Sequence, residues 1–254
     1  MDLPAAGSQD RLIKAVSVAN PNTIVINSTG VAISMPWLPS VRALIQAWFS
    51  GQETGNSIVD ILFGKTNPCG KLPISIPRSL EDTPIFRNFP GDVKTLQVHY
   101  EEGVEIGYRY YDKYPEKALF PFGFGLSYTD FVISNIALGD TELVHGSSIR
   151  LQADVKNTGG VAGKEVVQVY VAPVGSTLDR PLKTLAGFAK VELAPGESKI
   201  VTVEFSYEAA AFWDEDSNLW RVEKGEYDIL AGNSSTSIAG TARVAVKETF
   251  TYKP

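Results

Sequence analysis

Acidic side chains are the residues of this sequence best suited to chemistry, because two carboxyl groups facing each other across a glycosidic bond supply a nucleophile or base and a proton donor. The candidates are Glu53, Asp60, Glu101, Glu102, Glu105 and Asp112. Glu53 lies in a glycine-flanked turn before an expected helix, where the helix dipole alone favours a carboxylate. No sequence pattern pairs any candidate with a second carboxylate, so no residue of this chain is predicted to be catalytic.

Other reactive groups give no stronger signal. The sequence contains no Gly-x-Ser-x-Gly elbow, phosphate loop or dinucleotide fingerprint. Cys69, the single cysteine, lies in a Pro-Cys-Gly turn and is interpreted as a bystander. His99 and His145 are the only histidines and lack ligand-like neighbours. We therefore expect no metal and no cofactor, and no substrate-binding residue is assigned.

Composition limits the possible partners. The 254 residues are 44% hydrophobic and 20% charged, which is typical of a folded globular protein. A net charge of −6 disfavours nucleic acid, and no apolar run reaches the ~18 residues of a membrane span. Residues 1–5 lack the charged and apolar regions of a signal peptide, so we expect a cytoplasmic location for the chain as written. The oligomeric state is left open.

Helical and strand patterns alternate at the start of the chain. Residues 9–20 carry apolar side chains at helical spacing, with Ser8 as the expected cap. Residues 23–27 form a short β-branched run typical of a strand buried on both faces. Residues 41–48 fit a helix or a strand, and residues 54–63 have helical spacing. This alternation predicts an α/β layer with parallel strands.

Residues 67–125 are rich in turns and aromatic side chains. A loop of this length is unusual in a compact domain unless it covers another surface. Packing between domains is therefore favoured over a role in stacking against a ligand.

Alternating apolar and polar residues dominate from residue 131 onward, which predicts about seven short strands in a two-sheet sandwich of the immunoglobulin or fibronectin type. The acidic segment 213–218 lacks the spacing of a calcium-binding loop and is interpreted as a solvated turn. Six of the strands are located by their patterns, near residues 148–155, 166–171, 184–193, 199–205, 227–231 and 241–246.

Several strings resemble one enzyme family in order along nearly the whole chain. Five of them are similar to the second domain of glycoside hydrolase family 3, namely residues 47–56, 60–64, 67–73, 104–112 and 119–129. Three more resemble the fibronectin type III-like domain of the same enzymes, namely residues 180–183, residues 185–188, and residues 225–227 leading to 232–235. The nearest group resembles fungal β-glucosidases.

This resemblance implies the fold class and the domains. Residues 1–127 are expected to be the carboxy-terminal part of the family's α/β sandwich domain, including the aromatic loop. Residues 128–254 are expected to form a fibronectin type III-like β-sandwich.

The resemblance also implies where the chemistry resides. The family's nucleophile is an aspartate in an amino-terminal (β/α)₈ barrel. Its acid/base glutamate, in the fungal group, lies in a Glu-Gly-x-Asp-Arg stretch just before Met-Asp-Leu-Pro, which residues 1–4 match. We therefore expect the chain to begin after that glutamate, to need the barrel as its partner and a β-glucoside as substrate of the full-length enzyme, and to be inactive alone.

Two alternatives stay open. In the first, the chain is a non-catalytic sandwich module that binds carbohydrate or a protein. Exposed coplanar rings on one sheet face would favour this alternative, and Trp213 and Trp220 are the residues to inspect. In the second, the chain is a half-enzyme that is active when it pairs with a separately encoded barrel chain.

Overall fold

The computed structural model describes residues 8–92 and 94–253, so the tetrapeptide at residues 1–4 lies outside the described residues. The chain divides into two compact units that interleave along the sequence. Unit 1 consists of residues 1–66, 75–102 and 114–120, and unit 2 of residues 67–74, 103–113 and 121–254. Both classes of element expected from the sequence are present, and the fold class of an α/β part followed by a β-sandwich is confirmed.

Unit 1 begins with the predicted helix and strands. Helix α1 (Gln9–Ala19) has Ser8 at the expected cap position, although the Ser8 side chain accepts no hydrogen bond there. Strand β1 (Ile24–Asn27) pairs in parallel with β2 (Ala43–Gln46), as the alternation of elements predicts. The remaining elements of this segment are η1 (Leu38–Ser40), η2 (Gly51–Glu53) and α2 (Thr54–Leu62).

Two details of unit 1 settle or correct the sequence interpretation. The segment 41–48 contains a strand and not a helix, because its backbone pairs with β1 from Ile24↔Ala43 to Asn27↔Gln46. The prediction that residues 23–27 are buried on both faces is wrong for this chain, since Ile24 and Ile26 are exposed.

The long aromatic segment contains short elements that belong to both units. In unit 1, β3 (Ile76–Pro77) pairs antiparallel with β4 (Ala118–Phe120), and the helical turns η3 (Leu80–Asp82) and η4 (Pro115–Lys117) lie nearby in sequence. In unit 2, the segment contributes α3 (Tyr108–Lys113) and the stretches 67–74 and 121–125, which contain no helix or strand.

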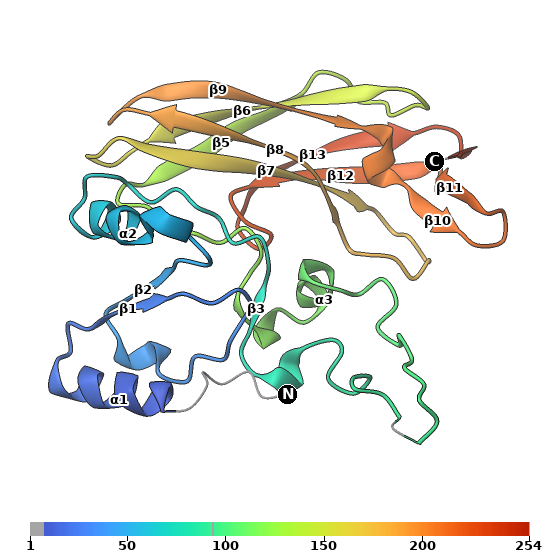
Figure 1. Ribbon diagram of the computed structural model, residues 1–254. Helices are drawn as coiled ribbons and strands as arrows, with labels where there is room; N and C mark the ends of the chain where they lie inside the picture. Colours follow the sequence, from blue (N-terminus) through green and yellow to red (C-terminus); the bar gives the residue numbers. More distant parts are fainter. Residues whose placement is uncertain (1–7, 93, 254) are drawn as a thin grey trace. The chain divides into compact units, whose positions relative to one another are not determined.

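The predicted sandwich forms most of unit 2 (Figure 1). One sheet has the order β13-β12-β7-β8, and the other has the order β5-β6-β9, with antiparallel pairing throughout. The six strands located from the sequence are confirmed, the bounds of β8 match the prediction, and β5 brings the total to the expected seven. The strands are β5 (Phe131–Leu138), β6 (Ser148–Asn157), β7 (Gly163–Pro173), β8 (Thr184–Leu193), β9 (Ser198–Ser206), β12 (Gly225–Gly232) and β13 (Ile238–Val246).

Alternate residues of both sheets fill one core. Strand β6 shows the pattern most clearly, because every second residue from Ile149 to Asn157 is buried while most of those between face solvent. The core members from the facing sheets include Ile149, Leu151, Val155, Val167, Val169, Val203 and Ile229.

The outer face of β7 is also buried. Gln168 and Tyr170 alternate with the core valines and so point away from the core, yet both are almost fully covered. Tyr108 packs edge-on against Tyr170 with ring centroids 6.0 Å apart, and the Gly123 carbonyl accepts a hydrogen bond from Gln168. Parts of the aromatic segment therefore cover this face within unit 2.

Unit 2 also contains a small sheet that was not expected from the sequence. It has the order β10-β11-β14, with β10 (Phe212–Asp214), β11 (Leu219–Val222) and β14 (Phe250–Tyr252), and η5 (Tyr207–Ala210) precedes it. The acidic segment 213–218 is thus a hairpin whose exposed turn joins two strands. Among the described helices, none has the length and apolar character needed to span a membrane.

Candidate functional site

Four of the six candidate carboxylates, Glu53, Asp60, Glu101 and Glu102, lie in unit 1. Glu53 is exposed at the start of α2, where its Oε2 accepts a hydrogen bond from Asn56 Nδ2 at 2.6 Å. Asp60 pairs with Lys65 at 3.2 Å near the end of the same helix. The contacts of these two residues therefore explain them structurally.

The adjacent acids Glu101 and Glu102 behave in the same way. Glu101 is exposed, and Glu102 Oε2 accepts a hydrogen bond from Asn88 Nδ2 at 2.7 Å. These contacts give neither acid a facing carboxylate partner.

The other two carboxylates meet lysines in unit 2. Asp112 of α3 pairs with Lys183 at 2.5 Å, and Glu105 pairs with Lys113 at 2.8 Å. Asp112 and Lys183 are almost fully buried, and Glu105 is largely so. We call Glu105, Asp112, Lys113 and Lys183 the buried charge cluster.

Burial sets the electrostatics of this cluster. Desolvation raises the pKa of Asp112 above its ordinary value, and the hydrogen bond and charge of Lys183 oppose this effect only in part. The hydrogen bond to Glu105 raises the pKa of Lys113. Each carboxylate is thus matched to its own ammonium group, which favours an anchoring role over the proton exchange of a hydrolytic pair.

Aromatic contacts help to hold α3 on the sandwich. The Tyr108 ring lies 5.1 Å from that of Phe122, and its hydroxyl accepts a hydrogen bond from the Leu185 amide at 2.9 Å. The Lys183 ammonium lies 5.6 Å from the Tyr170 ring centroid, and burial raises the pKa of Tyr170. The buried charge cluster and these aromatic contacts therefore hold α3 against the sandwich within unit 2.

A second polar network holds the other covering segments. Lys71 pairs with the buried Glu165 at 2.7 Å and also donates to the Gly125 carbonyl at 3.1 Å. Asn233 Nδ2 donates a hydrogen bond to Glu165 Oε2. The main-chain carbonyl of Asn233 accepts a hydrogen bond from Gln168 Nε2 at 2.8 Å. Sequence reasoning missed Lys71, Glu165 and Lys183, although Lys71 and Lys183 lie within strings that carry the family resemblance.

The remaining reactive groups stay apart. The Sγ of Cys69 is 3.2 Å from Lys190 Nζ, His99 is exposed, and His145 packs against aromatic rings. Within residues 8–92 and 94–253, no group of three or more His, Cys, Asp or Glu side chains is arranged to hold a metal ion.

Two family models match the chain. The glycosyl hydrolase family 3 C-terminal domain matches residues 1–128, which is half of the chain. The chain belongs to glycoside hydrolase family 3. The fibronectin type III-like domain matches residues 165–235, within the sandwich of unit 2.

Family 3 relatives are similar along the whole chain. β-Glucosidase B of Emericella nidulans is 46% identical over 262 residues, which cover 99% of this chain and 30% of that protein. The crystal structure of the Kluyveromyces marxianus β-glucosidase in complex with glucose has a TM-score of 0.92 at 41% identity, covering 99% of this chain and 30% of that one. The family 3 β-glucosidase of Bifidobacterium adolescentis has a TM-score of 0.88 at 40% identity, with 96% and 36% covered.

The coverage shows which part of a family 3 enzyme this is. The chain spans about 30% of the length of the fungal relatives and corresponds to their carboxy-terminal part. The buried charge cluster and the Lys71–Glu165 network thus lie in the carboxy-terminal domains of the family 3 enzymes.

Proposed function

We propose that this chain is the carboxy-terminal scaffold of a retaining β-glucosidase that removes terminal β-D-glucosyl residues, and that both catalytic carboxylates belong to other polypeptide. The observation that carries the proposal is the match to β-glucosidases over 99% of this chain and only 30% of the relative. The local contacts of Glu53, Asp60 and Glu102 and the lysine pairing of Glu105 and Asp112 support it.

Without a nucleophile and a proton donor, the chain alone lacks both covalent catalysis and acid–base catalysis. Acid–base catalysis by itself typically raises a reaction rate ~10²–10⁴-fold. The test is release of the aryl group from an aryl β-D-glucoside by the purified 254-residue chain. We expect no turnover above that of buffer. The Kluyveromyces marxianus β-glucosidase serves as the positive control.

A chimera tests the positive half of the proposal. This chain replaces the matching carboxy-terminal 30% of Emericella nidulans β-glucosidase B, whose own remaining part supplies the rest of the enzyme. We expect the chimera to hydrolyse the aryl β-glucoside. Turnover by the isolated chain that is lost in Glu53→Gln or Glu101→Gln would contradict the proposal, as would an inactive chimera that is folded.

A further inference from the structure

Helix α1 of unit 1 presents an apolar face to the solvent. Four apolar residues recur at the i, i+3, i+4 and i+7 spacing of one helix face, and we call them the α1 stripe: Leu12, Ala15, Val16 and Ala19. All four are exposed, Leu12 by 62% and Val16 by 45%. A stripe of this kind normally packs against a hydrophobic core. The α1 stripe therefore lacks the packing partner that its pattern implies.

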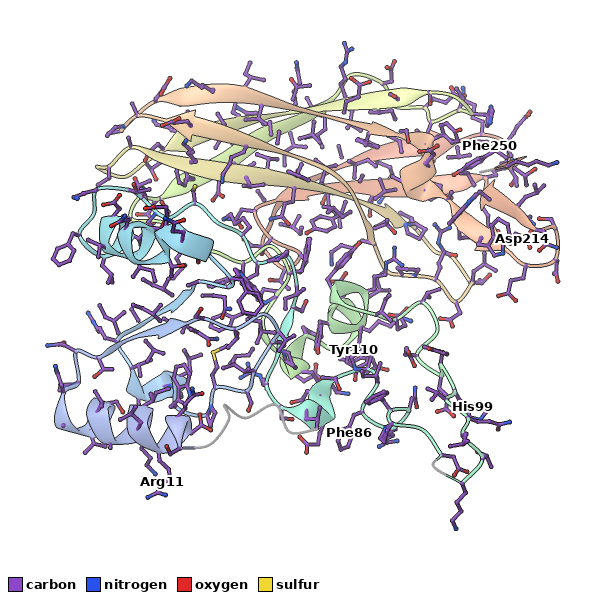
Figure 2. The ribbon with its side chains drawn as sticks, viewed as in Figure 1. Arg11, Phe86, His99, Tyr110, Asp214 and Phe250 are labelled. Atoms are coloured by element: carbon purple, nitrogen blue, oxygen red, sulfur yellow. The ribbon has the colours of Figure 1, made fainter. Side chains whose placement is uncertain are left out.

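The polar side of α1 attaches the helix to the rest of unit 1. Asp10 accepts a hydrogen bond at 2.9 Å from Nε1 of Trp37, which is buried. Ser17 is also buried. Figure 2 shows Arg11 pointing away from β1 and β2, and Arg11 lies on the same side of the helix as the exposed Val18. The contacts of α1 within unit 1 thus leave the α1 stripe free.

Strand β1 has an open edge next to α1 in sequence. Among residues 8–92 and 94–253, β1 pairs with β2 alone, so one of its edges has no neighbouring strand. The carbonyls of Thr23 and Asn27 accept hydrogen bonds from the β2 side. Alternate residues of a strand direct their backbone groups to opposite edges, so those of Ile24 and Ile26 point to the free edge. The side chains of Ile24 and Ile26 are 47% and 40% exposed.

This edge lacks the features that protect exposed sheet edges. Such edges in folded proteins generally carry charged residues or proline, or another segment covers them. The β1 sequence Ile-Val-Ile-Asn has neither a charge nor a proline. Parallel sheets, moreover, occur almost only with both faces covered. An open apolar helix face and an unprotected parallel strand, from consecutive elements, together indicate a surface that another polypeptide covers.

The length of the relatives indicates which polypeptide this is. The matched fold occupies 30% of the Kluyveromyces marxianus β-glucosidase chain and corresponds to the carboxy-terminal part of the family, so most of such an enzyme precedes it. We propose that the α1 stripe and the free edge of β1 bind this preceding polypeptide, which adds a strand to β1 and apolar side chains to the stripe. The inference rests on the proposed function, because it takes the chain to be the scaffold of such an enzyme.

The first test compares amide hydrogen exchange in the 254-residue chain and in its chimera with Emericella nidulans β-glucosidase B. A strand added to β1 gives the amides of Ile24 and Ile26 hydrogen-bond partners. We therefore expect these amides to exchange at least about tenfold more slowly in the chimera. Residues 149–155 of β6 are the matched control, because β6 is paired on both sides by β5 and β9, and they should exchange at equal rates in both proteins.

The second test places a carboxylate on either side of α1. Val16→Asp alters the α1 stripe, and Val18→Asp is the matched control on the same helix, at a position that is 80% exposed. In the chimera, Val16→Asp should lower the Tm by about 5 °C or more, because it buries a charge among apolar side chains, and Val18→Asp should change it by less than about 2 °C. In the isolated chain both variants should have the same small effect, because both positions are exposed.

Four results would overturn the proposal. They are equal exchange of Ile24 and Ile26 in the two proteins, equal effects of Val16→Asp and Val18→Asp in the chimera, a chimera that does not fold, and a dimer of the isolated chain that Val16→Asp dissociates while leaving the chimera unchanged. The last result would identify a second copy as the occupant. Neither test measures hydrolysis, so a folded but inactive chimera would contradict the proposed function without altering either result.

Discussion

The pair Asp112–Lys183 offers the sharpest test of what holds α3 on the sandwich. The side chains of Asp112 and Lys183 are 3% and 12% exposed and lie 2.5 Å apart, so removal of Lys183 leaves a buried carboxylate without its counter-ion. Breaking a buried pair from one side typically costs about 3–5 kcal/mol. We therefore expect Lys183→Met to lower the free energy of unfolding of unit 2 by about that amount, a large share of a typical domain's ~5–15 kcal/mol.

The matched control is the exposed pair Lys164–Glu192, whose side chains are 45% and 67% exposed at 3.3 Å. It joins β7 to β8 in the same unit, and Lys164→Met should cost no more than ~1 kcal/mol. The double variant Asp112→Asn/Lys183→Met removes both charges, and it should recover about 2 kcal/mol or more of the loss. Urea denaturation followed by circular dichroism measures all four proteins. A Lys183→Met cost equal to that of Lys164→Met would refute the reasoning.

The pH dependence of the same variant follows from the Asp112 pKa. Burial raises this pKa in the folded state above the ordinary aspartate value of 3.8, so folding favours the protonated acid. Stability from this group is fully present below the unfolded pKa and is lost as the pH rises through the folded pKa. The cost of Lys183→Met should accordingly be smaller near pH 4 than at pH 7, because a neutral Asp112 needs no counter-ion.

Further predictions concern packing and alkaline stability. A Cβ at Gly125 would lie 2.1 Å from the Gly70 carbonyl oxygen, whereas one at Gly160 meets nothing within 4 Å, so Gly125→Ala should cost about 1–3 kcal/mol and Gly160→Ala far less in urea denaturation. Ile229→Ala removes a fully buried core side chain and should lower the unfolding free energy by about 2–5 kcal/mol, whereas Ile200→Ala at an exposed position should change it by less than ~0.5 kcal/mol. Desolvation raises the pKa of Tyr252 from 10.0 to about 12, so stability from this group should fall as the pH rises through that interval. Tyr252→Phe should flatten the fall measured by thermal unfolding, and an unchanged slope would contradict the assignment.

Much of the sandwich was predictable because strand alternation is a local pattern. Residues 148–155 alternate between apolar and polar side chains, and β6 begins at the predicted Ser148 and runs two residues further, to Asn157. The strands of the small sheet have three or four residues each, too few to show a period, and β14 pairs with β11 across the intervening β12 and β13. They were missed for that reason.

The candidate acids were predictable in kind but not in role. Glu105 and Asp112 were on the sequence-based list, yet nothing local indicated that Lys113 and Lys183 would neutralise them. Trp213 and Trp220 were singled out as a possible platform, but their mutual angle of 75° follows from packing.

The family and most of the strands could be recognised from the sequence alone, because both the family motifs and the strand alternation are patterns of consecutive residues. The tertiary structure decided that residues 43–46 form a strand, that Asp112 has a counter-ion from the segment before β8, and that Trp213, Trp220 and Tyr252 share one face of the small sheet. Each of these depends on which distant segments become neighbours. That choice is made by the burial of apolar surface summed over the whole fold, and no short stretch of sequence contains it.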